Sequence, residues 1–217
     1  MANHLSLRSG NPALSSETFS GLKSFTSEES MTINGTVNKT AISLTILLIT
    51  ASFTFSPNYS FLIWPGFIGG FIVAIITIFK KHWAPITVPV YAALEGLALG
   101  GISYMYNLQF EGIVSQAILL TLGILFALLF AYKTKIIAPT ENFKLGVFAA
   151  TAGIGIVYLI SFVMSFFGSG LPVMNPMNSS LFSIGFSLFV VVIASLNLVL
   201  DFDFIEEGSE KGMPKYM

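Results

Sequence analysis

Six long apolar stretches divide this 217-residue chain and restrict how it can fold. Each is close to the roughly 20 residues that a helix needs to cross about 30 Å of hydrocarbon. Only the first, at 16 residues, is short. The stretches are residues 40–55, 61–79, 86–106, 113–132, 145–167 and 181–200. We therefore predict an all-α fold, a polytopic transmembrane helix bundle with six spans.

The basic residues predict how these spans are oriented. All ten Lys and Arg residues lie outside the predicted spans. They precede the first span or follow the second, fourth and sixth, whereas the loops after the first, third and fifth spans have none. Short loops rich in Lys and Arg stay on the cytoplasmic side of a membrane. We therefore expect a multi-pass protein of the inner (plasma) membrane with a cytoplasmic N-terminus.

Composition excludes several classes of function. Hydrophobic residues make up 54% of the chain and charged residues 10%, whereas about a quarter of the residues in soluble domains are charged. The net charge of −1 offers no basic surface for a nucleic acid. The chain has no cysteine, and His4 and His82 both lie outside the spans. Cysteine-ligated metals, thiol nucleophiles and a Ser–His pair within the membrane are therefore excluded. We predict no enzyme activity, no cofactor, no nucleic-acid partner and a lipid bilayer as the surroundings.

The polarity of the sequence predicts three regions. Residues 1–38 are rich in Ser, Thr, Asn and Gly and contain no long apolar run, so we expect a flexible polar cytoplasmic arm. Residues 39–203 form the predicted transmembrane bundle. Residues 204–217 form a predicted acidic cytoplasmic tail.

Small residues at four-residue spacing mark predicted contacts between helices. In lipid there is little hydrophobic drive between helices, so close backbone approach has to supply the attraction. The positions are Ala92, Gly96 and Gly100 in the third span, Gly66 and Gly70 in the second, and Thr151 and Gly155 in the fifth. These residues predict packing and by themselves indicate no activity.

Glu95 is the only acidic or basic residue well inside a predicted span. A charged carboxylate at the centre of a membrane costs about 2.5–3.5 kcal/mol on insertion scales. We therefore expect Glu95 to face protein, water or a cation, or else to be protonated. It is a candidate for an ion or proton pathway, and a neutral, hydrogen-bonded structural glutamate is the alternative.

Asp201 and Asp203 end the predicted sixth span, and three glutamates follow them. Negative charge at a helix C-terminus opposes the helix dipole, so helix stability does not explain this cluster. Asn197 lies one turn before Asp201 and shares its face, which extends a polar line inward. Asn197 is therefore a second candidate for the pathway.

The chemistry of Asp201 and Asp203 suggests a gate. Carboxylates are hard oxygen ligands suited to calcium, and two close ones in a dry site would share a proton. We predict that Asp201 and Asp203 sense protons at a cytoplasmic mouth, with transient calcium there and no fixed metal site. A solvated helix end with ordinary acidic residues is the alternative.

Three separated segments carry a resemblance to a known family: MTINGTVNKT at residues 31–40, PVYAALEGL at 89–97 and NLVLDFDFIE at 197–206. Together they resemble the bacterial YccA-like branch of the Bax inhibitor family, also called transmembrane Bax inhibitor motif proteins. The resemblance covers about residues 31–217.

The resemblance implies a seven-helix bundle that leaks calcium and is gated by two aspartates responding to protons. One aspartate belongs at the end of the sixth helix, where Asp201 or Asp203 would be its counterpart. The other belongs on the seventh helix. The chain stops at Met217, where relatives enter that helix, so we expect the last helix and its aspartate to be missing.

Three functions are consistent with these features. The first is a pH-sensitive calcium-leak channel with carboxylates at its cytoplasmic mouth. The second is a non-conducting modulator or binding partner of a membrane protease, with residues 1–38 as a docking handle. The third is a proton-coupled small-solute transporter in which Glu95 carries the proton.

Overall fold

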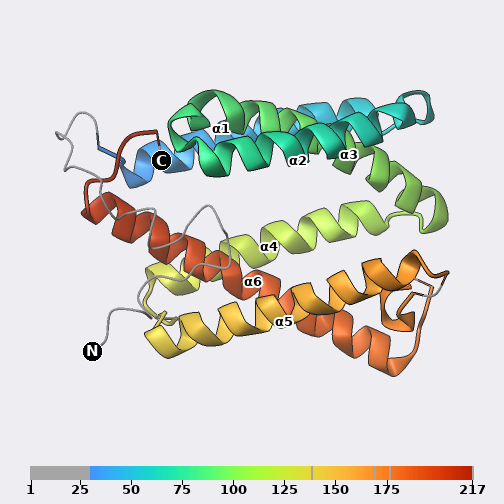
Figure 1. Cartoon of the computed structure of the whole chain (residues 1–217). Coiled ribbons are helices and arrows are strands. Elements are labelled where there is room, and N and C mark those ends of the chain that lie inside the picture. Colours follow the sequence, from blue (N-terminus) through green and yellow to red (C-terminus); the bar gives the residue numbers. More distant parts are fainter. Residues whose placement is uncertain (1–29, 138, 169, 176, 217) are drawn as a thin grey trace. The chain divides into compact units, whose positions relative to one another are not determined.

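The structure is a computed structural model that describes residues 30–137, 139–168, 170–175 and 177–216. Six α-helices follow one another along these described residues (Figure 1). They are α1 (Ile33–Thr54), α2 (Ile63–Phe79), α3 (Ala84–Gln109), α4 (Ile113–Lys133), α5 (Glu141–Ser165) and α6 (Leu181–Glu210). Short 3₁₀ segments precede α2, α3 and α6, namely η2 (Pro57–Leu62), η3 (Lys81–Trp83) and η4 (Pro172–Met174).

Among the described residues, six helical segments are long and apolar enough to cross a membrane, which confirms the predicted all-α polytopic architecture; the second of them is η2 and α2 together, Pro57–Phe79. Large apolar side chains are exposed along them, including Phe79 and Leu181, each more than 80% exposed. Among the described residues the only β-pairing is an isolated antiparallel bridge between Ser30 and Pro214. In a membrane protein the exposed apolar side chains face lipid, so their exposure has no solvation cost.

Helix α1 begins at Ile33, so part of the predicted arm is helical. Thr32 caps this helix: the Gly35 N–H donates to Thr32 Oγ1 at 3.1 Å. A threonine in this position accepts a hydrogen bond from one of the first backbone N–H groups of a helix, which have no partner within the helix. Hydropathy alone placed the start too late because the first turns of α1 are polar. The remainder of the predicted arm, residues 1–29, lies outside the described residues.

Helix α6 continues to Glu210, so residues 204–210 of the predicted tail form its last turns. Gly212 has φ +63° and ends the helix. The Met213 N–H donates to the Gly208 carbonyl at 3.0 Å, and the Gly212 N–H donates to the Ser209 carbonyl at 3.2 Å. These two bonds form a Schellman motif, in which a left-handed residue, here glycine, lets the last carbonyls find donors.

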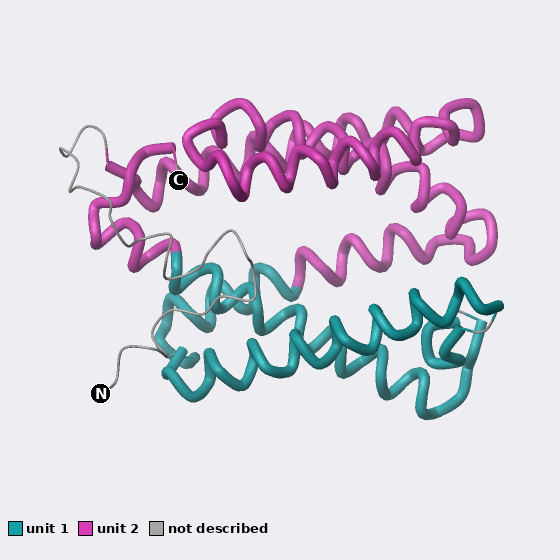
Figure 2. Tube along the Cα trace, in the orientation of Figure 1, with its two compact units in different colours: residues 1–20, 124–204 teal, residues 21–123, 205–217 magenta. Residues whose placement is uncertain are grey.

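The chain divides into two compact units (Figure 2). The described part of one comprises residues 124–137, 139–168, 170–175 and 177–204, with α5 and most of α6. The described part of the other comprises residues 30–123 and 205–216, with α1, α2 and α3. Helices α4 and α6 contribute to both units.

In the unit that holds α1, α2 and α3, α3 contacts both of the other helices. Gly96 and Gly100 face α1 so closely that a Cβ on either would overlap the carbonyl oxygen of Leu47 or Ala51, respectively. Ala92, one turn earlier, is buried. The stripe of small residues on α3 therefore lies where two helix backbones approach closely.

Helix α2 approaches α3 through glycines as well. A Cβ at Gly66 would lie 2.7 Å from Leu94 O and 2.8 Å from Ala98 N, both backbone atoms of α3. A Cβ at Gly70 would lie 3.3 Å from Glu95 Oε2. The first contact is too short for any side chain. The second leaves room for a carboxylate beside the α2 backbone.

The spacing of Thr151 and Gly155 on α5 does not produce a similar contact. A Cβ at Gly155 would meet nothing within 4 Å, so the predicted helix contact is wrong at that position. Thr151 instead contacts α6 through its hydroxyl. Four-residue spacing of small residues permits close approach but does not require it, and polar side chains join α5 to α6.

Candidate functional site

A hydrogen bond between side chains joins α5 to α6 within the unit of residues 124–204. Asn197 on α6 donates from Nδ2 to Thr151 Oγ1 on α5 at 2.9 Å. The same nitrogen donates to the Ile193 carbonyl, one turn earlier on α6, also at 2.9 Å. In lipid, where water cannot replace it, such a bond contributes about 0.6 kcal/mol and at most about 1.7 kcal/mol.

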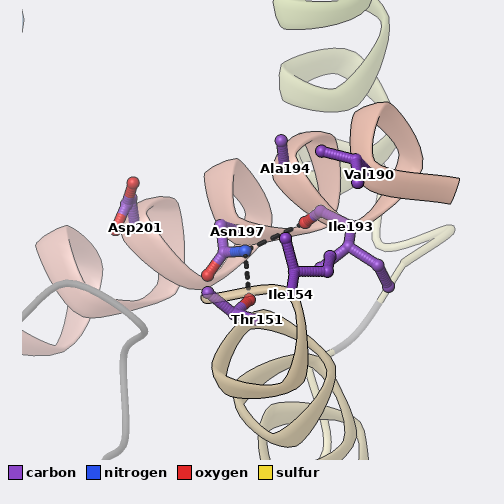
Figure 3. A pocket seen from close by; sticks show the side chains of 7 residues that line it. All are labelled: Thr151, Ile154, Val190, Ile193, Ala194, Asn197 and Asp201. Atoms are coloured by element: carbon purple, nitrogen blue, oxygen red, sulfur yellow. Dashed lines mark hydrogen bonds between the residues drawn. The ribbon is translucent and has the colours of Figure 1, made fainter. Parts of the chain in front are cut away.

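A pocket of about 330 Å³ lies beside this hydrogen bond (Figure 3). It is lined by Thr151 and Ile154 from α5 and by Val190, Ile193, Ala194, Asn197 and Asp201 from α6. The four aliphatic side chains make most of the wall apolar. A hydroxyl, an amide and a carboxylate are therefore gathered on one otherwise apolar surface.

An ion pair forms a second contact between α5 and α6. Lys144 Nζ lies 2.6 Å from Asp203 Oδ2, with 14% of the lysine side chain and 24% of the aspartate side chain exposed. Glu141, one turn earlier on α5 and 61% exposed, lies 3.7 Å from the same ammonium. Later residues of α5 pair with earlier residues of α6, so the two helices run antiparallel here.

The structure places the two predicted gate residues differently. Asp201 lines the pocket with Asn197, whereas Asp203 pairs with Lys144. Residues two apart on a helix are separated by about 200° around its axis, so the two carboxylates do not share a face. Among the described residues no three His, Cys, Asp or Glu side chains form a metal-binding group. Transient calcium at these aspartates stays a prediction.

Glu95 lies in the other unit, on α3, and is partly buried. Its carboxylate faces α2 at Gly70, as the 3.3 Å approach of a Cβ there shows. It therefore faces protein on at least one side, which is one of the surroundings expected for an acidic residue within a span. Because Glu95 and Asn197 belong to different units, a pathway that includes both stays a prediction.

The C-terminal residues of the chain hold the start of α1. We call residues 212–215 the strap. The Met31 N–H donates to the Met213 carbonyl at 2.6 Å, and Lys39 Nζ donates to the Lys215 carbonyl. Met31, Met213 and Pro214 are buried. The strap is a small packed region at the N-terminal end of α1, with no acidic residue of its own.

Three glutamates occupy the last turns of α6. Glu207 forms an ion pair with Lys211, one turn later along the chain. Glu206 and Glu210 are exposed. The 30-residue helix is about 45 Å long, whereas hydrocarbon is about 30 Å thick, so α6 extends well beyond one membrane surface. These glutamates therefore suit a solvated position at the membrane surface.

Two residues of this site were not predicted from the sequence. Lys144 served only as a mark of orientation, and Thr151 only as a small packing residue. An antiparallel arrangement of α5 and α6 would have suggested both partners, since Lys144 and Thr151 are seven residues apart and lie on one face of α5.

Comparison with known proteins settles the family. The sequence profile described as Bax inhibitor 1 like matches residues 11–217. The chain belongs to this family. Neither a curated protein nor a solved structure matches the chain. As a member of the Bax inhibitor family with six apolar helices, the chain is a multi-pass membrane protein, and its assignment to the YccA-like branch stays a prediction.

Proposed function

We propose that this Bax inhibitor family member is a pH-sensitive calcium-leak channel of the inner membrane that conducts ions and catalyses no reaction. Asp201 and Asp203 would lie at its cytoplasmic mouth, with the N-terminus on the same side. The basic loops support this orientation, because short loops rich in Lys and Arg stay cytoplasmic. The position of Asp201 near the end of α6 supports the position of the mouth, since its carboxylate would attract cations.

The observation that carries this proposal is the position of Asp201 in the pocket of α5 and α6. Its carboxylate shares this surface with the side-chain oxygens of Asn197 and Thr151. Carboxylate, amide and other neutral oxygens are ligands that calcium uses in proteins. A single carboxylate gives weak and reversible attraction, which passage requires because an ion has to leave the site again.

Protons would regulate this passage by neutralising carboxylates. A protonated Asp201 no longer attracts a divalent cation. On α5 the described charges next to this end of α6 are Lys144 and Glu141. A fall in pH would thus weaken the attraction for the ion.

Calcium-dye flux in proteoliposomes tests the proposal. We expect the wild-type protein to leak calcium with a rate that depends on pH. We expect Asp201→Asn to lower the rate and flatten the pH dependence, because the amide keeps the shape of the side chain and carries no charge. Glu210→Gln removes one charge from the exposed end of the same helix and is the matched control.

Two results would contradict the proposal. One is the absence of calcium flux above that of empty liposomes. The other is an Asp201→Asn protein whose flux and pH dependence equal those of the wild type and of Glu210→Gln. Saturable uptake of a small solute that is lost in Glu95→Gln would instead support the transporter.

A further inference from the structure

Lys144 is held in a position that the stability of its own helix does not explain. Thr140 caps α5, since the Phe143 N–H donates to its hydroxyl at 3.3 Å, so Lys144 lies at the start of the second helical turn. A cation close to a helix N-terminus is repelled by the helix dipole. Its side chain is nevertheless only 14% exposed, so it needs a negative partner.

Asp203 meets this need better than Glu141 does. The ion pair with Glu141 is within α5, longer, and exposed on the glutamate side, so solvent screens it and it adds little. The pair with Asp203 is shorter and partly buried, and it joins two helices. Removing one member of such a pair leaves the other as an uncompensated charge in a poorly solvated place.

We propose that the ion pair of Lys144 and Asp203 is the latch that holds α5 against the end of α6, and that Lys144 is therefore a positioning residue of the gate. This inference rests on the proposed function. It divides the work between the two aspartates: Asp203 anchors α5, while Asp201 faces the pocket and the passing ion. The latch has to part before α5 and α6 can separate at this end.

A charge-swap cycle in the full chain tests the latch. We expect Lys144→Glu to raise calcium leak severalfold, because it places two carboxylates where an ion pair stood. We expect Asp203→Lys to act in the same direction, and the double variant to return to the wild-type rate. Lys133→Glu reverses a charge of the same sign on an exposed residue of α4 and is the matched control.

A second measurement reports on the latch without any flux. The chain has no native cysteine, so cysteines placed at 144 and 203 are the only thiols. We expect a thiol crosslinker about as long as a Lys–Asp pair to join them within one chain and to reduce the leak. Cleaving the crosslink should restore the leak.

The outcomes separate the latch from the channel. Efficient crosslinking without flux in any variant would support the contact and overturn the channel. Two results would overturn the latch and leave the channel standing, given calcium flux through the wild-type protein. One is a double charge-swap variant that does not return to the wild-type rate. The other is the absence of a crosslink between positions 144 and 203. Equal flux in Lys144→Glu and Lys133→Glu would also overturn the latch.

Discussion

Replacing Gly66 by alanine tests the close contact between α2 and α3. A Cβ there would lie 2.7 Å from Leu94 O and 2.8 Å from Ala98 N, whereas ordinary contact begins at 3.4 Å. Both are backbone atoms and cannot rotate away, so the helices must separate by roughly 0.7 Å at this point. Overpacking of this kind costs about 1–3 kcal/mol, and the better helix propensity of alanine offsets up to about 1 kcal/mol. We expect the free energy of unfolding to fall by about 1–2 kcal/mol.

Titration with SDS in mixed micelles measures this free energy of unfolding. The chain has two tryptophans, Trp64 on α2 and Trp83 just before α3, so their fluorescence reports on the affected helices. Gly155→Ala is the control, because a Cβ there would meet nothing within 4 Å. A Gly66→Ala protein as stable as the wild type, or a Gly155→Ala protein equally destabilised, would refute the reasoning.

Three further contacts have measurable consequences. Asn197→Leu should lower the free energy of unfolding by about 0.6–1.7 kcal/mol, and Thr151→Val should add little to it in a double-mutant cycle; additive losses would show that the two side chains act separately. Thr140→Ala removes the cap of α5 and should cost about 0.5–2 kcal/mol in the same titration, whereas an unchanged midpoint would mean that the cap contributes nothing. Gly212→Ala forces a residue with a side chain into φ +63°, which costs about 1–2 kcal/mol and should loosen the strap. Trypsin should then cleave after Lys215 faster than in the wild type. Equal cleavage would show that the strap tolerates the strain.

The sequence predicted the spans well because membrane-crossing helices are selected by length and apolar content. The predicted starts and ends agree with the structure where charge or proline interrupts the apolar run, as at Ile113 for α4. The predicted starts and ends are wrong where a helix continues beyond the hydrocarbon as polar turns. Hydropathy does not detect the polar turns of α1 or the acidic turns of α6, since those turns are stabilised by backbone bonds and caps.

The site was only partly predictable for a different reason. The depth of Glu95 and the position of Asp201 follow from counting residues along one helix. The partners of Asp203 and Asn197 do not, because they depend on the register between α5 and α6, to which no local pattern corresponds. Lys144 contributed only to the predicted orientation, so its ion pair with Asp203 was not predicted.

The contrast between α3 and α4 has a consequence for sequence variation. Helix α4 has no buried residue, so any apolar side chain can occupy most of its positions while a charge there would meet lipid. Helix α3 buries Gly96 and Gly100 against the backbone of α1, where even a methyl group is too large. In a saturation library α4 should therefore vary freely in size, and α3 should be restricted to its smallest residues along this one face.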